Sequence, residues 1–229
     1  MQTNILITTG GSGGHVIPAT ILYDHLSKDA NVTISTDIRG SRYLDKDNYK
    51  YNVIDTPKLQ NIFFLPFKLI SILFLTFKSF VLLKNKKIEK IISTGGYMSL
   101  PLILAAKLLN LKIYLLEPNM VLGRSNKYFL NSCVKIFCYS KQIKNFPNNL
   151  KSKIEIIKPL VRENIYKLNL SSINKDKFNL LIVGGSQGAS IFDKSLKNSI
   201  VNISRKFSIK VIQQTDEKKI SELKNFYYK

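Results

Sequence analysis

The sequence repeats one local pattern, in which an apolar run is followed by a loop and then by a stretch with helical spacing. Apolar runs typical of β-strands occupy residues 4–9, 32–36, 51–54, 90–93, 112–116, 134–139 and 153–157. Helix-like stretches at residues 16–28, 65–83, 100–109 and 125–131 separate most of them. Such alternation predicts an α/β fold, because a chain that joins parallel strands must cross a face of the sheet. We expect residues 1–165 to form one complete Rossmann-like domain, with helices on both faces of a parallel sheet.

The pattern restarts toward the end of the chain. Residues 166–178 are polar and lack a clear period, so we interpret them as a linker. Strands are then expected at residues 179–183 and 209–213, with helices at residues 191–205 and 217–228. Two strands and two helices cannot bury a sheet core of their own. We therefore expect residues 179–229 to be the first part of a second Rossmann-like domain, so that either the chain is truncated or another polypeptide supplies the rest.

The charge balance points to anionic partners. The chain has 35 Lys and Arg residues against 15 Asp and Glu, which gives a formal net charge of +20. Such an excess favours phosphate-bearing ligands, nucleic acid or an anionic membrane surface. The lysines are spread along the sequence, however, and the richness in Lys, Ile and Asn is also typical of an AT-rich genome. The sequence shows neither an aromatic and basic platform nor a reading helix, so we do not expect a nucleic-acid partner.

Cysteine and histidine are too sparse to indicate a disulfide scaffold or a metal site. The two cysteines, Cys133 and Cys138, are expected to be reduced and structural. The two histidines, His15 and His25, lie far from both in the sequence. We predict no metal and no cofactor.

Residues 62–83 are apolar over a length comparable to a membrane span. Lys68 and Lys78 interrupt the segment, and a charge near the bilayer centre costs about 3 kcal/mol on insertion scales. The polar residues of a helix here would share one narrow side: Lys68, Ser71, Lys78 and Ser79. This predicts a helix that lies at an interface or packs on a sheet, not one that crosses a bilayer. The N-terminus also lacks the basic and apolar regions of a secretory signal.

A glycine-rich loop follows the first predicted strand. Gly10, Gly11, Gly13 and Gly14 stand just before the helix expected at residues 16–28. Glycines let a ligand approach the backbone, and a helix start presents free N–H groups and a partial positive charge to an anion. The spacing matches neither the dinucleotide fingerprint nor the P-loop. It predicts a phosphate or sugar-phosphate site.

Two further loops have the same construction. Gly95 and Gly96 follow the strand at 90–93, where a plain turn would be the default for an isolated pair. Together with the first loop, they suggest two helix starts that face one crevice at the carboxyl ends of the strands. Gly184, Gly185 and Gly188 open the second domain and suit a pyrophosphate or ribose phosphate.

The motifs become specific when they are read together. The sequence contains, in order, GGSGGHVIPA, STGGYMSLP, LLEPNMVLGRSNKYF, VREN and VGGSQGA. This series resembles the MurG family of glycosyltransferases from residue 4 to about residue 215. The resemblance implies the GT-B architecture, with two Rossmann-like domains facing a cleft. It also implies inverting transfer of N-acetylglucosamine from UDP-GlcNAc to the C4 hydroxyl of the muramyl sugar of lipid I, which makes lipid II for peptidoglycan.

The resemblance implies roles for single residues of the first domain. Ser12, Gly13 and Gly14 are expected to bind the donor. His15, at the end of the loop, and Glu117, at the end of the strand at 112–116, are alternative candidates for the general base.

Three further residues are carried over as donor or substrate contacts. Asn119 is expected to contact the nucleotide sugar, and Ser186 lies in the third loop. Arg162 is expected to bind the pyrophosphate, because a planar guanidinium forms two parallel charge-assisted bonds. Seven glycines support the phosphate loops: Gly10, Gly11, Gly95, Gly96, Gly184, Gly185 and Gly188.

The chain departs from the family pattern in three places. The family's His-Glu-Gln-Asn reads Leu-Glu-Pro-Asn at residues 116–119, so any role of that His or Gln is lost. Lys158, Pro159 and Leu160 replace the family's Gly-Asn-Pro, which would tilt Arg162. The family's later segment, which holds uracil and ribose, has no counterpart before the last residue.

The implied chemistry needs no metal. UDP would leave as an anion stabilised by helix starts and by Arg162. The pair Asp45 and Asp47 resembles a metal-binding Asp-x-Asp, but it falls in a polar loop and is interpreted as solvated surface. The lipid-linked acceptor implies a peripheral enzyme at the cytoplasmic face of the bacterial inner membrane. Residues 63–87 are the expected contact, with a buried core helix as the alternative.

Two other functions stay open on the sequence. The chain could be another GT-B nucleotide-sugar transferase that acts on a glycolipid. It could also bind the lipid-linked precursor and catalyse nothing alone, with a second chain supplying the remaining donor-binding segment.

Overall fold

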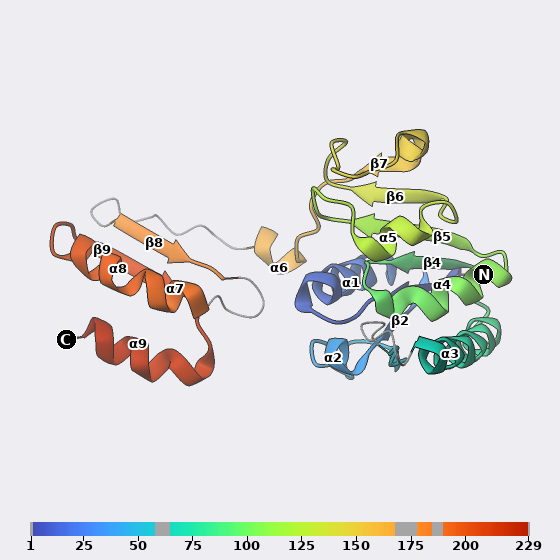
Figure 1. The fold of residues 1–229 in the computed structure, drawn as a ribbon, viewed down its shortest axis with the longest axis horizontal. Helices are drawn as coiled ribbons and strands as arrows, with labels where there is room; N and C mark the ends of the chain where they lie inside the picture. The colour runs from blue at the N-terminus through green and yellow to red at the C-terminus, as the bar shows by residue number, and fades with distance from the viewer. Residues whose placement is uncertain (1, 58–64, 168–177, 185–189, 229) are drawn as a thin grey trace. The chain divides into compact units, whose positions relative to one another are not determined.

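The structure is a computed structural model that describes residues 2–57, 65–167, 178–184 and 190–228. The chain divides into two compact units, Met1–Ile165 and Tyr166–Lys229 (Figure 1). The division falls where the sequence analysis ended the first domain. The functional roles given to the two units stay predictions.

The first unit is built on a parallel sheet of seven strands in the order β3-β2-β1-β4-β5-β6-β7. The strands are β1 (Asn4–Thr8), β2 (Asn31–Thr36), β3 (Tyr51–Val53), β4 (Lys90–Ser93), β5 (Lys112–Glu117), β6 (Lys135–Cys138) and β7 (Ile154–Ile156). The chain moves outward from β1 to β3 and then returns to the other side of β1 with β4. The point between β1 and β4 is thus the topological switch point, where open α/β sheets bind ligands. The first two glycine loops follow these two strands.

Helices cover both faces of this sheet, as predicted (Figure 1). They are α1 (Gly13–Leu26), α2 (Ile38–Ser41), α3 (Leu65–Asn85), α4 (Leu100–Leu108) and α5 (Arg124–Phe129), whereas the short α6 (Glu163–Tyr166) lies at the boundary between the two units. One buried cluster joins α1 to the face formed by Ile7 and Ile34. A second cluster joins α3, α4 and α5 to the opposite face, around Leu6, Ile91 and Leu115. Each fully buried aliphatic side chain stabilises the fold by about 1.5–3 kcal/mol.

The second unit has two parallel strands, β8 (Phe178–Ile182) and β9 (Ile209–Gln213). Its helices are α7 (Ser190–Ser195), α8 (Lys197–Ser204) and α9 (Ile220–Tyr227). Leu181 and Ile212, on neighbouring strands, remain exposed. The small sheet therefore leaves apolar surface uncovered, as two strands alone must.

Three predicted helices were wrong in their bounds. The helix expected at residues 191–205 is divided between α7 and α8, because Leu196 lies between them with φ −95° and ψ −20°. The helix expected at residues 217–228 begins as a 3₁₀ turn, where the Asp216 side chain accepts from the N–H of Lys218. The helix expected at residues 16–28 begins earlier, at Gly13, so the glycine loop supplies its first turn.

The long apolar helix α3 packs against α4 through one side. Ile72, Thr76, Ser79 and Leu83 are buried on that side. Ser79 therefore does not share an outer polar side with the lysines, contrary to the sequence prediction. Within the ranges described above, no helix has the length and apolarity needed to cross a membrane.

Candidate functional site

The first glycine loop presents two unused backbone donors. Ser12 is extended, with φ −121° and ψ 161°, and its carbonyl accepts from the N–H groups of His15 and Val16 at 3.0 and 3.2 Å. Among the described residues, nothing accepts the N–H of Gly13 or of Gly14. These two groups open the 14-residue helix α1. They are therefore free to bind an anion, with the helix dipole behind them.

A buried carboxylate shapes the rest of this loop. Asp37 has no exposed surface, and its Oδ1 accepts from the N–H groups of Gly11 and Gly40, each at 2.8 Å. Gly11 has φ +84°, which favours glycine, and its N–H is occupied by Asp37. A Cβ on Gly10 would lie 2.7 Å from Asp37 Oδ1. Gly10 and Gly11 thus support the loop, while Gly14, at the start of α1, is exposed and Gly13 beside it is buried.

Arg39 connects the first glycine loop to the second. Its Nε donates to Asp37 Oδ2 at 3.0 Å, and its Nη2 donates to the Tyr97 hydroxyl at 3.0 Å. Burial raises the pKa of Tyr97, the Arg39 charge opposes this shift, and the Asp37 charge adds to it. Tyr97 therefore keeps its proton at neutral pH.

Sequence reasoning missed the pair formed by Asp37 and Arg39. A local signal was present, since Asp37 directly follows a strand and precedes Gly40 by three positions, which is typical of a helix N-cap. The contact with Gly11 was not visible, because it depends on β2 lying beside β1.

The second glycine loop uses its amides internally. The N–H of Gly95 donates to Ser93 Oγ at 3.2 Å, and that of Gly96 donates to Ser125 Oγ at 3.0 Å. Both glycines have positive φ angles, +99° and +88°. This loop therefore positions its neighbours and does not itself offer these donors to a ligand.

His15 lies between the two loops. Its Nδ1 is 2.8 Å from the carbonyl oxygen of Thr94. A Cβ on Gly95 would lie 3.1 Å from the imidazole, a tight approach that the lack of a side chain avoids. The structure thus brings His15 together with Gly13, Gly14, Gly95 and Gly96.

Glu117 is an anchor for the loop that follows β5. It is 2% exposed, and its Oε1 accepts from both the backbone and the side-chain nitrogen of Asn119, at 3.2 and 3.0 Å. Its Oε2 accepts from the N–H of Gly123 at 2.7 Å and from Asn126 Nδ2 at 3.0 Å. These four donors occupy the lone pairs of the carboxylate. The carboxylate of Glu117 is thus fully engaged within the loop, where it orients Asn119.

Arg162 lies away from the glycine loops. Its exposed side chain makes no hydrogen bond or salt bridge within the described part of the chain. Its charge acts on Asp24, whose pKa is raised by burial and lowered by a hydrogen bond from Tyr49 and by Arg162. Asp24 is nine residues beyond His15 on α1, or about 14 Å along the helix axis. The first unit therefore does not bring Arg162 to the phosphate loops.

The third glycine loop is only partly described. Gly185, Ser186 and Gly188 lie outside the described residues. The N–H of Gly184 donates to Gln214 Oε1 at 3.2 Å.

The second unit also contains a buried carboxylate that the sequence analysis did not single out. Asp193 accepts from Gln213 Nε2 and Thr215 Oγ1, each at 2.8 Å, and Lys219 Nζ lies 3.8 Å away. Tyr227 donates to Gln213 Oε1 at 2.9 Å, beside a cavity of about 570 Å³ between β9 and α9. This network fixes the carboxyl end of β9.

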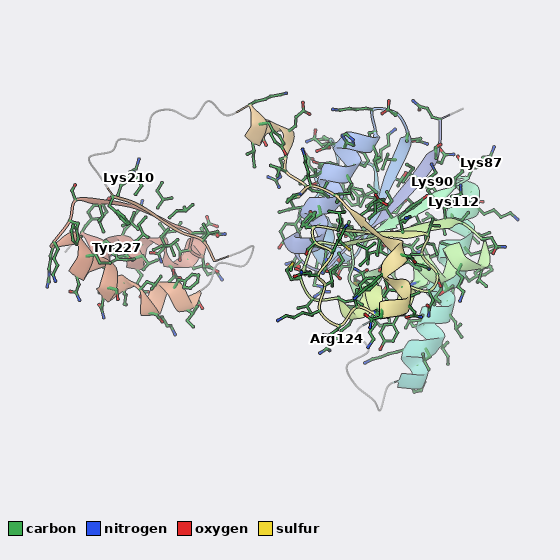
Figure 2. The ribbon with its side chains drawn as sticks, turned by 90° about the horizontal axis from the view of Figure 1, so that it is seen from above. Lys87, Lys90, Lys112, Arg124, Lys210 and Tyr227 are labelled. Carbon is green, nitrogen blue, oxygen red and sulfur yellow. The ribbon has the colours of Figure 1, made fainter. Side chains whose placement is uncertain are left out.

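The positive charge is not concentrated at the glycine loops. Figure 2 shows Lys87, Lys90 and Lys112 together, and the last two begin neighbouring strands in register. They lie at the amino ends of β4 and β5, whereas the glycine loops follow the carboxyl ends. Arg124, also labelled in Figure 2, begins α5 beside Ser125 and is an exposed cation that follows β5. Exposed lysines occur on other elements as well, among them Lys107 on α4 and Lys194 on α7.

The structure also places the acidic pair and the two cysteines that the sequence analysis discussed. Asp45 and Asp47 are exposed, and Asp45 Oδ1 accepts from the N–H of Asp47 in a local turn. Cys133 and Cys138 are buried free thiols. Over the described ranges, no group of three or more His, Cys, Asp or Glu side chains is placed to hold a metal ion.

Comparison with known proteins agrees with the motifs. The sequence model of the glycosyltransferase family 28 N-terminal domain matches residues 5–138, more than half of the chain. A transferase of Pelagibacter ubique is 49% identical over 228 residues, which cover 99% of this chain and 64% of the relative. A relative from Rickettsia canadensis is 35% identical over 233 residues, with 98% and 65% covered. Both are named UDP-N-acetylglucosamine–N-acetylmuramyl-(pentapeptide) pyrophosphoryl-undecaprenol N-acetylglucosamine transferase.

Solved structures show the same fold. Acinetobacter baumannii MurG has a TM-score of 0.74 at 23% identity, covering 99% of this chain and 62% of that one. A UDP-GlcNAc 2-epimerase from Neisseria meningitidis has a TM-score of 0.64 at 13% identity, with 99% and 69% covered. This chain spans about 64% of the length of its Pelagibacter relative. The match of the family model and the shared motifs show that the chain belongs to glycosyltransferase family 28, within which it resembles the MurG transferases.

Proposed function

We propose that this chain acts in the transfer of N-acetylglucosamine from UDP-GlcNAc to lipid I, the step that makes lipid II. The observation that carries the proposal is the position of His15 between two glycine loops at the switch point of the sheet. The free N–H groups of Gly13 and Gly14 beside it suit a phosphate. The relatives' printed name supplies the donor and acceptor class.

In the proposed reaction, the C4 hydroxyl of the muramyl sugar attacks C1 of N-acetylglucosamine. His15 takes the hydroxyl proton as the new C4 oxygen to C1 bond forms. The bond from C1 to the phosphate oxygen breaks on the opposite side, and its electron pair leaves with UDP. Attack opposite to the leaving group inverts the configuration at C1. The N–H groups of Gly13 and Gly14 stabilise phosphate charge.

Other residues support this reaction without taking the proton. Asn119 contacts the nucleotide sugar in the orientation that Glu117 gives it. Ser12 belongs to the first loop, and Ser186 is proposed as a donor contact through the resemblance alone. The resemblance also carries the pyrophosphate role of Arg162, which no contact within the first unit supports.

The outer side of α3 supports contact with a membrane. Phe67, Ile70, Leu73, Phe74 and Phe77 are exposed by 64–72%, while Thr76 and Ser79 are buried. A helix at a water-exposed surface normally turns its polar side chains to the solvent and its apolar ones to the core. The helix α3 does the opposite, and such an exposed apolar patch is typical of an interaction surface. The exposed amines of Lys78 and Lys84 suit anionic headgroups. We infer a peripheral position at the cytoplasmic face of the inner membrane, with α3 in the interface.

The test is transfer of labelled N-acetylglucosamine from UDP-GlcNAc to a short-chain lipid I analogue by this chain, without added metal. Turnover that links the sugar to C4 with inverted configuration would support the proposal. Absence of turnover, with the acceptor analogue still bound, would favour a chain that binds lipid-linked precursor. A second chain would then be needed to supply the rest of the donor site. Turnover with a different glycolipid in preference to lipid I would favour a GT-B nucleotide-sugar transferase with another acceptor.

A further inference from the structure

Thr94 is joined to His15 at two places. The Thr94 carbonyl oxygen lies 2.8 Å from Nδ1 of the imidazole, and the Thr94 hydroxyl lies 3.0 Å from the His15 carbonyl oxygen. Thr94 itself is 1% exposed. Its N–H donates to the Thr8 carbonyl at 3.1 Å, and its hydroxyl is 2.8 Å from that of Thr9. Thr94 is therefore a fixed point of the core that holds both the side chain and the backbone of His15.

The carbonyl contact decides which ring nitrogen is protonated. A carbonyl oxygen can only accept a hydrogen bond, so Nδ1 must carry the hydrogen in the neutral ring. The lone pair is then left on Nε2. A free histidine in water favours the opposite tautomer, with the hydrogen on Nε2. The contact with Thr94 thus reverses the intrinsic preference of the imidazole.

The two glycines after Thr94 lie against the imidazole ring of His15. Gly95 turns the chain with φ +99°, a conformation that side chains disfavour. A Cβ there would lie 3.1 Å from Nδ1 and Cε1 of His15. A Cβ on Gly96 would lie 3.9 Å from Cδ2. The two glycines therefore line one side of the ring next to the Thr94 carbonyl.

We propose that Thr94 is a positioning residue, which holds His15 as the Nδ1–H tautomer and leaves Nε2 to accept the proton of the acceptor hydroxyl. Thr94 touches no substrate in this scheme and acts only through His15. The inference rests on the proposed function for the role of Nε2. The tautomer itself does not depend on turnover and can be measured separately.

The direct test is nitrogen NMR of the whole chain labelled with ¹⁵N in histidine, at a pH where both rings are neutral. The chain has two histidines, and the exposed His25 is an internal reference for a solvated ring. A His25→Gln variant assigns the signals. His15 is expected to show a protonated Nδ1 and an unprotonated Nε2, while His25 shows mainly Nε2–H. A His15 ring that is mainly Nε2–H would overturn the proposal, whether or not the chain transfers sugar.

Substitution of Thr94 tests the positioning role. Thr94→Val removes the hydroxyl that anchors the His15 backbone, whereas Thr94→Ser keeps it. Thr94→Val is expected to increase the Nε2–H share and to lower kcat about tenfold, part of the roughly 10²–10⁴-fold that a positioned base contributes. KM should change little, and Thr94→Ser should restore both readouts.

A matched control is Thr20→Val, which removes a buried hydroxyl bonded to the Ile17 carbonyl on the same helix. It should leave the His15 tautomer unchanged. If Thr94→Val lowers kcat but leaves the tautomer as in the wild type, or if Thr20→Val shifts the tautomer equally, the positioning role is wrong. Should Thr94→Val fail to fold, the wild-type tautomer decides: a His15 ring that is mainly Nε2–H would overturn the proposal.

Discussion

The backbone N–H of Gly11 donates to the buried carboxylate of Asp37 at 2.8 Å, across 26 positions of sequence. This bond joins the loop after β1 to the turn after β2. The same oxygen accepts from Gly40, and the other oxygen pairs with Arg39. One buried charge therefore sets the form of the loop that precedes His15. It also holds a guanidinium above the loop, at 3.5 Å from a Cβ built on Gly11.

Asp37→Ala is predicted to destabilise the chain by about 3 kcal/mol, because it leaves buried donors and a half-exposed guanidinium without their partner. Denaturant unfolding measures the loss. The control is Asp47→Ala, at an exposed position, which should change stability by less than about 0.5 kcal/mol. Equal stability of the two variants would contradict the role given to Asp37.

Replacing two glycines of the same loop by alanine is predicted to change the stability of the chain in opposite directions. A Cβ on Gly10 would lie 2.7 Å from Asp37 Oδ1 and 2.9 Å from Met98 Cγ, so Gly10→Ala should lose about 1–3 kcal/mol. A Cβ on Gly14 meets only Ser12 Oγ, at 3.7 Å, and Gly14→Ala should gain up to about 1 kcal/mol of helix propensity. Thermal unfolding of both variants checks the signs. A stabilised Gly10→Ala variant would show that the loop is not packed as described.

Glu117→Gln is predicted to lose about 2 kcal/mol of unfolding free energy. The amide that replaces one oxygen would face a donor, either from Asn119 or from Gly123 and Asn126, and could not accept it. Denaturant unfolding of the variant measures this loss. Unchanged stability would mean that the carboxylate is not committed to the loop, and it would return Glu117 to the list of possible bases.

The buried thiol predicts a loss of stability at alkaline pH. Burial raises the pKa of Cys138 from 9.0 to about 12, and the charge of Glu117 adds to the shift. The folded pKa exceeds the unfolded one, so the contribution to stability is complete below pH 9. It is lost as pH rises toward 12, because the unfolded thiol ionises first.

Unfolding measured at pH 8 and pH 10.5 should show this decline, and Cys138→Ala should reduce its slope. In the folded chain at pH 8, both thiols should react slowly with a thiol reagent, because burial also raises the pKa of Cys133. Rapid labelling of Cys138 at pH 8 under native conditions would contradict the burial of this side chain.

The exposed side of α3 predicts binding to anionic vesicles. Replacing Phe74 and Phe77 together by serine should weaken cosedimentation at least tenfold, because each phenylalanine contributes about 1.5–3 kcal/mol when buried. Phe207→Ser is the matched control, since Phe207 is 63% exposed but lies in the second unit. An equal effect of both changes, or no binding by the wild type, would argue that the outer side of α3 meets something other than lipid.

The regular parts of the fold were predictable from sequence for a physical reason. Ile7, Ile34 and Ile92 lie in register on central strands that are buried on both faces, so their strands read as continuous apolar runs. The position of the glycine loops followed, because a parallel sheet brings the carboxyl ends of its strands to one edge.

The contacts that organise the site could not be predicted in this way. The hydrogen bond from Gly11 to Asp37 depends on the order of the strands. The hydrogen bonds that engage the Glu117 carboxylate depend on the path of the loop after β5, which has no periodic sequence pattern. Ser79 was predicted to share one polar side with Lys68 and Lys78, but it is buried because that part of α3 packs inward, against the pattern of polar residues. Neither glycine nor proline marks the break at Leu196, where α7 ends and α8 begins.

The most direct test of the account is kcat for sugar transfer to the lipid I analogue by His15→Gln, measured beside Glu117→Gln. We predict that His15→Gln lowers kcat by about 10²-fold or more with KM for UDP-GlcNAc nearly unchanged, because the variant loses only the proton acceptor. Glu117→Gln should retain more of its kcat and show its main effect on stability and KM. Wild-type kcat in His15→Gln, or a greater loss of kcat in Glu117→Gln, would contradict the assignment of His15 as the base.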